Sequence, residues 1–335
     1  MKVLTIIRAR EWWEYKFPPI LIIPYVVILK SGASFGTSIF SLCFLLSALI
    51  VGAIYVSILN DITDIDEDQS AGKHNRMAKL NRFQRGMLLL ALISVAFLFS
   101  WFMRNNLMAV VMYIASYLSF TLYSVPPFRL KKRGILGLFA DASGSQMFPT
   151  LFIAAFMSVQ FQYELSVTDL TMIAIWSLCF GLRGILWHQF HDLENDRRSG
   201  LHTIVQQMGS TTTKIVGRSI LFFEVSALLV FLVRLGNNYF LYTLLIYLVY
   251  IGYRHMKTNL EVIIIKYNTN HFEIVMNVFY QVFLPVSILI AMTINHLEFA
   301  ILLVIHLVFF PYGVYLVVKN VVGLFHSSKW FNALF

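Results

Sequence analysis

The sequence predicts an all-α integral membrane protein in which nine or ten helices cross the bilayer. Hydrophobic residues make up 58% of the 335 residues and charged residues only 13%, whereas a soluble domain is about 25% charged. Apolar runs of roughly 20 residues, the length of a helix that crosses a bilayer, recur along the whole chain. The alternating pattern of a membrane β-barrel is absent. A multi-pass helical bundle is therefore the expected fold class.

The chain begins with an amphipathic segment. Residues 1–16 place Trp12, Trp13 and Tyr15 beside charged side chains, a composition that suits a short helix at the membrane–water interface. Such a segment either anchors the first span or faces a substrate, and the composition fits both roles.

A series of apolar runs follows this segment and gives the expected spans. They cover residues 17–34, 38–60, 87–103, 107–124, 135–157, 170–190, 213–235, 239–256, 273–294 and 298–320. The eighth is the least clear, because residues 253–266 also suit an interfacial helix. No linker or soluble domain interrupts the series, which predicts a single membrane domain over residues 1–335.

The basic residues predict which ends of the spans face the cytoplasm. With a cytoplasmic N-terminus, only Lys30, Arg104, Arg183 and Arg234 of the 26 Lys and Arg residues lie outside the termini and cytoplasmic segments. This bias is the positive-inside rule, and it places the loops 60–86 and 188–212 in the cytoplasm, at the cell membrane or at the inner membrane of a bacterium. Topology therefore explains the net charge of +9 better than nucleic-acid binding does.

A cluster of acidic residues ends the second expected span. Asn60, Asp64 and Asp68 are four residues apart and share one helix face, with Asp61 one turn before Asp64 and beside this row. Carboxylates gathered at the end of a span repel one another unless cations are bound. Hard oxygen ligands of this kind suit Mg²⁺ that bridges protein carboxylates to a substrate phosphate.

A second acidic cluster ends the sixth expected span. Asp192 and Asp196 form a row that His188 extends back by one turn. Basic residues follow each cluster, as Lys73 and Arg76 do after the first, and such cations suit a bound phosphate. Two acidic clusters at the same membrane face, each followed by basic residues, favour a binding site over ordinary solvated loop charges.

Together these residues resemble the motifs of the UbiA superfamily of intramembrane prenyltransferases. The first family motif, Asn-Asp-x-x-Asp-x-x-x-Asp, and the Lys and Arg that follow it are matched by Asn60, Asp61, Asp64, Asp68, Lys73 and Arg76. The stretch 123–131, Tyr-Ser-Val-Pro-Pro-Phe-Arg-Leu-Lys, is also similar to the family. The second motif, Asp-x-x-x-Asp, is matched by Asp192 and Asp196, but His188 and Gln189 stand where many members have another acidic residue or a Tyr-Asp pair.

The resemblance implies a bundle around a central cavity that opens to lipid, where Mg²⁺ and an isoprenyl diphosphate bind between the two Asp motifs. Loss of diphosphate then leaves an allylic carbocation, which an aromatic or other lipophilic acceptor captures. The implied metal ligands are Asp61, Asp64, Asp68, Asp192 and Asp196. The implied diphosphate ligands are Lys73, Arg76, Arg129 and Lys131. Asn60 and Tyr123 join Asp64 as catalytic residues, Asn60 beside the metal and Tyr123 beside the cation.

Three other functions remain open at this stage. A terpene cyclase of the same superfamily captures the cation within one chain, and a polyprenyl-phosphate phosphoribosyltransferase transfers a sugar instead. A transporter of anionic lipids or metabolites uses similar charges without catalysis. Each of these functions takes place in the lipid bilayer. The sequence indicates neither a nucleic-acid partner nor an obligate protein partner.

Polar residues inside the expected spans suggest further contacts. Asp141 and Ser145, one turn apart, are placed to line the cavity. Arg183 lies nine residues before Asp192, about 180° around a helix, so we expect it to face away from the metal row and to pair with Glu224. Glu273, Asn277 and Gln281 form a stripe on the ninth span, suited either to an acceptor or to interhelical hydrogen bonds.

Overall fold

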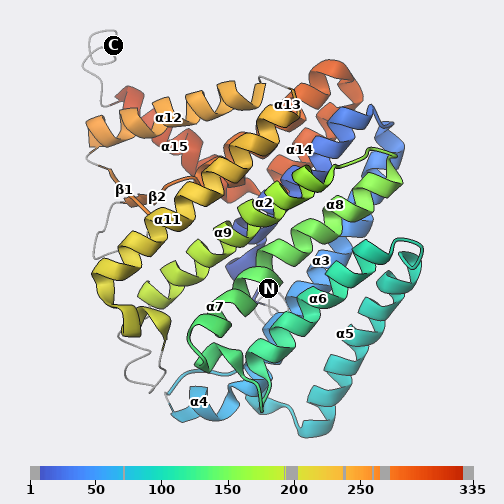
Figure 1. Cartoon of the computed structure of the whole chain (residues 1–335), viewed down its shortest axis with the longest axis vertical. Coiled ribbons are helices and arrows are strands. Elements are labelled where there is room, and N and C mark those ends of the chain that lie inside the picture. Colours follow the sequence, from blue (N-terminus) through green and yellow to red (C-terminus); the bar gives the residue numbers. More distant parts are fainter. Residues whose placement is uncertain are drawn as a thin grey trace.

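We describe a computed structural model of the chain over residues 8–70, 72–191, 193, 203–236, 239–258, 260–264 and 272–326. The described residues form a helical bundle (Figure 1), so the predominantly helical fold is confirmed. Its elements are α2 (Ala9–Ser31), α3 (Phe35–Thr63), α4 (Ile65–Ser70), η1 (Met77–Lys79), α5 (Arg82–Phe102), α6 (Leu107–Ser124), η2 (Leu130–Lys132), α7 (Ile135–Ala142), η3 (Ser143–Met147), α8 (Phe148–Gln160), α9 (Val167–His191), α11 (Ile204–Arg234), α12 (Tyr239–Thr258), β1 (Glu261–Ile263), β2 (Phe272–Ile274), η4 (Phe279–Phe283), α13 (Leu284–Asn295), η5 (Leu297–Phe299), α14 (Ala300–Phe309) and α15 (Pro311–His326).

Helix α2 forms much of the core. It continues without a break from Ala9, so the described part of the expected interfacial segment is the first two turns of this helix. Ile22, Ile23 and Val26 are fully buried, and the helix packs against α8 and α13. Its first turns therefore reach the centre of the bundle at the end that carries the acidic residues.

The number of spans differs from the prediction. Among the described residues, five helices are long and apolar enough to cross a membrane: Phe35–Thr63, Arg82–Phe102, Leu107–Ser124, Val167–His191 and Thr211–Arg234. Helices α14 and α15, bent by 86°, make a sixth if they form one broken span. The expected count of nine or ten is not confirmed.

The composition of α2 and a break near the C-terminus explain part of this difference. Helix α2 is less apolar than the other long helices, because it contains prolines at 18, 19 and 24 and charged residues near both ends. Pro311 begins α15 and has no N–H to continue α14. Trp13 donates its indole hydrogen to the carbonyl of Phe309, and the Tyr312 amide donates to the Glu14 carboxylate at 3.2 Å. The start of α2 thus holds this bend in place.

The segment before α13 was predicted wrongly. The ninth span was expected to begin as a helix at residue 273, but Glu273 lies on β2, which pairs in parallel with β1. Met276 has a left-handed φ of 68°, and the helix follows only after it. The expected stripe of Glu273, Asn277 and Gln281 is therefore not formed on one helix, and Glu273 instead pairs with Arg254 of α12.

The fifth expected span is built from two helices joined by a π-helical turn. Helix α7 leads through η3 into α8, which has Pro149 in its first turn. A second π-helical turn, η4, precedes Pro285 at the start of α13 in the same way. Because proline provides no N–H for the turn before it, the hydrogen-bond register shifts there, and single π-turns of this kind are frequent at functional sites.

Replacing Gly181 by alanine is expected to destabilise the fold, because α9 crosses α7 without space for a side chain. A Cβ at Gly181 would lie 2.7 Å from the carbonyl oxygen of Ala142, and overpacking of this kind costs about 1–3 kcal/mol. Gly184→Ala, one turn further along the same helix, meets nothing within 4 Å and is the matched control. Thermal unfolding in detergent measures both variants, and equal unfolding temperatures would contradict the prediction.

Candidate active site

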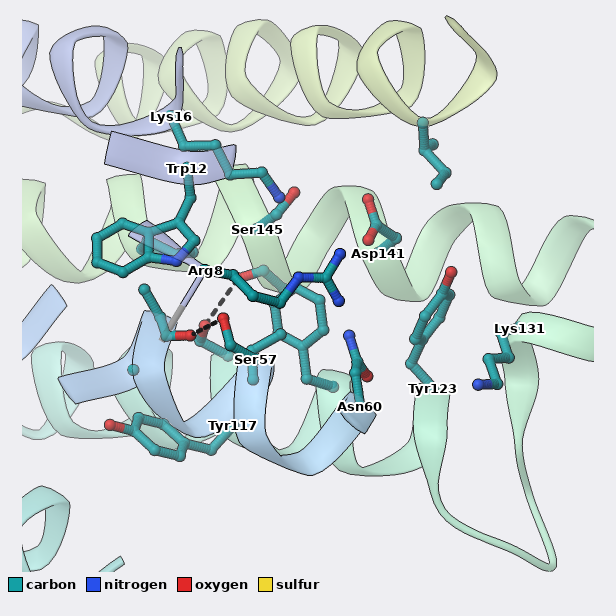
Figure 2. A pocket seen from close by; sticks show the side chains of 18 of the residues that line it. Arg8, Trp12, Lys16, Ser57, Asn60, Tyr117, Tyr123, Lys131, Asp141 and Ser145 are labelled. Atoms are coloured by element: carbon teal, nitrogen blue, oxygen red, sulfur yellow. Dashed lines mark hydrogen bonds between the residues drawn. The ribbon is translucent and has the colours of Figure 1, made fainter. Parts of the chain in front are cut away.

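A cavity of about 480 Å³ lies within the bundle. Helices α2, α3, α6 and α9 and the segment α7–η3–α8 each contribute side chains to its wall (Figure 2). Tyr113, Phe152 and Phe17 make one part of the lining apolar, while Asp64, Asp68 and their neighbours make another part charged. A cavity of this kind suits an amphiphilic ligand with a charged group at one end.

The predicted row of Asn60, Asp64 and Asp68 is present. The amide of Asp64 donates to the Asn60 carbonyl at 3.0 Å, and the amide of Asp68 donates to the Asp64 carbonyl at 2.8 Å. These bonds continue the helical register from α3 into α4, so the three side chains stay on one face. All three line the cavity.

Asp61 points away from this row. It is 5% exposed, and its two carboxylate oxygens accept hydrogen bonds from Arg8 at 3.3 Å and Arg76 at 3.2 Å. Neither Asp61 nor Arg76 lines the cavity. The metal role of Asp61 and the diphosphate role of Arg76 stay predictions, and in this structure the two residues contact each other.

Asn75 connects the basic loop to the acidic row. Its side-chain amide donates to the carbonyl of Asp61 at 2.7 Å and to the carboxylate of Asp68 at 2.8 Å. The asparagine oxygen in turn accepts from the amide of Met77. Asn75 thereby holds the loop containing Lys73 against the acidic row, and Lys73 lines the cavity.

The second basic stretch reaches the same acidic row from the connection between α6 and α7, at the end of the bundle where α4 lies (Figure 1). Arg129 contacts Asp64 at 3.2 Å and Glu67 at 3.0 Å, and Lys131 forms an ion pair with Asp64. Burial lowers the pKa of Lys131, while the charge of Asp64 opposes that shift. Lys131 lines the cavity, and Arg129 does not.

Tyr123 and Asn60 lie where the charged and aromatic parts of the cavity meet. Ser124 donates a hydrogen bond to the side-chain oxygen of Asn60, which fixes the end of α6 against α3. Tyr123 lines the cavity, with Phe120 edge-on to its ring at 6.3 Å. Tyr117 and Tyr113 continue the aromatic stripe along α6.

The donor atoms of the described residues suit a hard cation. Asn60, Asp64, Glu67 and Asp68 line the cavity and carry amide and carboxylate oxygens, which are the ligands that Mg²⁺ prefers. In the described part of the chain, no three His, Cys, Asp or Glu side chains converge on one point. These oxygens therefore fit one side of a metal site.

The second acidic row lies outside the described residues, because Asp192 and Asp196 both fall there. The helix that leads to it is described. His188 and Gln189, near the end of α9, line the same cavity as Asp64. The first motif therefore lines the cavity with its own side chains, and α9, which precedes the second motif in sequence, lines it with His188 and Gln189.

The sequence analysis named no residue near the N-terminus as a site residue, but Trp12 and Lys16 of α2 line the cavity, and so does Arg8, which precedes the helix with a left-handed φ of 55°. The spacing of four residues places Trp12 and Lys16 on one helix face, whereas no such spacing predicts the position of Arg8. Glu67 and Asn75 were also missed, since neither belongs to the Asn-Asp-x-x-Asp-x-x-x-Asp pattern.

Comparison with known proteins gives a consistent result. Residues 17–262 match the sequence model of the UbiA prenyltransferase family. A structure of a digeranylgeranylglyceryl phosphate synthase is similar with a TM-score of 0.52 at 17% identity, over 89% of this chain and 96% of that chain. A UbiA homolog from Archaeoglobus fulgidus bound to GPP and Mg²⁺ is similar with a TM-score of 0.50 at 13% identity, over 95% of this chain and 100% of that chain. At such identities the likeness concerns the fold. No curated protein is significantly similar in sequence.

Proposed function

This chain belongs to the UbiA prenyltransferase family, and from that premise we propose that it transfers an isoprenyl group from an isoprenyl diphosphate to a lipophilic acceptor, with Mg²⁺ as cofactor and release of diphosphate. The observation that carries the proposal is a single cavity with the row Asn60, Asp64 and Asp68 at one part and an aromatic lining at another. The Archaeoglobus fulgidus homolog, which binds GPP and Mg²⁺, supports the choice of donor and metal.

In this proposal the charged part of the cavity holds the diphosphate. Asp64 and Asp68, together with Asp192 and Asp196 from the second motif, hold Mg²⁺, which neutralises charge on the departing diphosphate. Lys73 and Lys131 bind phosphate oxygens as further cations. Arg129 and Arg76 hold the neighbouring acidic residues in position by the ion pairs already described.

The aromatic part of the cavity holds the isoprenyl tail. The rings of Tyr123, Phe120 and Tyr117 lie along one face of α6, and the π-face of an aromatic ring stabilises a nearby cation. The apolar part of the wall also limits the access of water to the reactive carbon. Tyr123, closest along α6 to Ser124 and its partner Asn60, is the ring we assign to the carbon that loses diphosphate.

Release of diphosphate by the purified full chain in detergent tests this function. Allylic diphosphates of several chain lengths are supplied with Mg²⁺, with and without a membrane extract as a source of acceptor. Release that requires both Mg²⁺ and the extract is expected. Release without the extract, with a hydrocarbon product, would instead identify a terpene cyclase, and no release from any allylic donor would overturn the proposal.

The family and the apolar helices show an integral membrane protein, and we infer that the end carrying Asp64 faces the cytoplasm. Basic residues concentrate in the segments at that end, as the positive-inside rule requires. Gln69 is exposed there, so a cysteine placed at this position should react with an impermeant thiol reagent only after cells are opened. Labelling in intact cells would show that this end faces the outside and that the inferred orientation is wrong.

Replacing Lys131 by alanine is expected to weaken donor binding about tenfold or more, because a charge-assisted hydrogen bond contributes about 1.5–3 kcal/mol. Lys132→Ala is the matched control, since this neighbouring lysine pairs with Glu67 and does not line the cavity. The donor concentration that gives half-maximal diphosphate release measures both variants. If the two variants need similar donor concentrations, Lys131 does not bind the diphosphate.

A further inference from the structure

Helix α15 begins where α14 has already run the length of α2. Phe299, just before α14, lies against the first side chain of α3 with ring centroids 5.6 Å apart. Further along α14, His306 meets Tyr25 of α2 at 3.1 Å. Directly after α14, Phe310 stacks on Trp13 with ring centroids 5.4 Å apart. Helix α14 is therefore antiparallel to α2, and α15 begins at the end of the bundle that carries the acidic residues.

The bend between α14 and α15, at residues 309–311, lies close to the level of the membrane surface. Arg8, directly before α2, contacts Asp61 at 3.3 Å, and Trp13 lies five residues further on, about 7.5 Å along a helix. Asp66, exposed beyond Asp61, requires water and not hydrocarbon. The headgroup layer on each side of a bilayer is about 5–8 Å thick. Trp13, and with it the bend, therefore lies near the boundary between headgroups and hydrocarbon.

The direction of α15 leaves it little depth to cross. The axes of α14 and α15 differ in direction by 86°. The 16 residues of α15, about 24 Å as a helix, therefore run across the direction of α14 and do not extend it. Figure 1 shows α15 next to α12 at the edge of the bundle.

One face of α15 is packed against the rest of the bundle. Val317 and Val321 pack against the hydrophobic core. A Cβ at Gly313 would lie 2.9 Å from a side chain of η4. Asn320 donates a hydrogen bond to Tyr250 of α12 at 3.3 Å. These four residues of α15 fall within about 100° of the helix circumference, so the opposite side is left exposed.

The exposed face of α15 has the composition of a helix at the membrane–water interface. It carries Tyr312, Tyr315, Val318, Lys319 and Val322. Tyrosine is enriched at the level of the headgroups, and a lysine there lays its stem on apolar surface and keeps its ammonium in water. In the hydrocarbon core the charge of Lys319 would be costly. The face therefore suits the interface better than the interior of the bilayer.

Two residues of α2 hold α15 in this orientation. Trp13 donates to the carbonyl of Phe309, and Glu14 accepts from the amide of Tyr312 at 3.2 Å. A carboxylate at the N-terminus of a helix stabilises that end. Trp12 and Lys16, on another face of the same turns of α2, line the cavity. The start of α2 thus contacts α15 on one side and the cavity on another.

We propose that α15 is a surface helix which binds the lipid headgroups at the end of the bundle carrying the acidic row, and that α14 crosses the membrane without it. The exposed face lies at the boundary between headgroups and hydrocarbon, with the tyrosine hydroxyls and the Lys319 ammonium among the headgroups. Through Trp13 and Glu14, this lipid contact anchors the start of α2. The inference concerns the membrane and holds whichever reaction the cavity performs.

Spin labels along the exposed face test this placement. The full chain carries Cys43→Ala and Cys179→Ala and one of Tyr312→Cys, Tyr315→Cys or Val322→Cys, and is reconstituted in vesicles of phosphatidylcholine and phosphatidylglycerol. Collisions of the label with oxygen, which enters hydrocarbon, and with a water-soluble nickel chelate give its depth. The three labels are expected at the same shallow depth. Depths that differ by about 15 Å between positions 312 and 322, as in a helix along the membrane normal, would overturn the proposal.

The same measurement also detects a protein partner on this face. Labels shielded from both oxygen and the nickel chelate would show that protein covers the face, which would overturn the proposal as well. Ile301→Cys and Val308→Cys, exposed on α14, are the controls. Their labels should differ in depth by about 10 Å, because α14 crosses the membrane, and equal depths there would contradict that part of the proposal.

Replacing Glu14 by alanine tests the link between α2 and α15. The mobile fraction of a label at position 315 should rise about fivefold, the factor that follows loss of one helix cap. Glu298→Ala, an exposed carboxylate at the opposite end of α14, is the matched control. Glu14→Gln keeps an acceptor oxygen and should show a smaller rise, and unfolding temperatures in detergent show which variants are folded. An unchanged label spectrum in both Glu14 variants would overturn the link to α2.

Discussion

Replacing Asp64 by asparagine is expected to reduce diphosphate release about 100- to 1,000-fold, the loss that follows removal of one group which stabilises a developing charge. Asp64 is the middle residue of the acidic row and contacts both Arg129 and Lys131. Asparagine keeps the size of the side chain and removes its charge. The variant therefore loses a proposed metal ligand and the anion that pairs with Arg129 and with Lys131, of which Lys131 is a proposed diphosphate ligand.

Asp66→Asn is the matched control for this variant. Asp66 lies two residues further along the chain, is exposed, and does not line the cavity. The Asp66→Asn substitution removes the same charge at the same end of the bundle. Diphosphate release is measured over a range of Mg²⁺ concentrations, where Asp64→Asn should require more metal and Asp66→Asn should match wild type. Equal losses in the two variants would mean that general charge, and not the row, matters.

The long helices could be predicted because their apolar length is a local property. Helix α3 and the span Thr211–Arg234 fall close to their expected ranges. Pro311 is a local signal for the break between α14 and α15, but the contacts that hold the bend could not be predicted, because Trp13 and Glu14 lie nearly 300 residues away in sequence. The short strands β1 and β2 were missed for another reason, because the apolar content of residues 273–294 predicts that the helix begins at residue 273.

In the candidate site, too, local spacing predicts some features, and contacts with other elements determine the rest. The spacing of Asn60, Asp64 and Asp68 predicts their shared face, and helical hydrogen bonds across the end of α3 produce it. The orientation of Asp61 depends on Arg8 and Arg76. Spacing places Asp61 beside the row but does not say which arginines approach it from other elements.

The lining of the cavity by α2 could not be read from composition either. Residues 1–16 are equally suited to an interfacial anchor and to a substrate-facing helix, and the difference lies in where α2 packs. Because α2 crosses the core against α8 and α13, one face of its first turns meets the cavity. Lys16 is thereby available to a substrate and not only to lipid headgroups.

Removing either partner of the Arg183–Glu224 pair is expected to destabilise the fold by about 3–5 kcal/mol, since it leaves an uncompensated buried charge. The pair was predicted from helix phase, and it is confirmed. Arg183 donates to both Glu224 oxygens, at 2.8 and 2.7 Å. The two residues are 1% and 0% exposed, so water cannot take over either partner.

Neutralising both residues together, as Arg183→Met with Glu224→Gln, should cost much less than the sum of the single changes, because no unpaired charge remains. Denaturation in detergent measures the four proteins of this cycle. The pair joins α9 to α11, and α9 leads into the second acidic motif. We therefore expect the single variants to lose diphosphate release along with stability, and the double variant to regain both. Single and double variants that are equally damaged would show that the pair acts through side-chain packing and not through its charges.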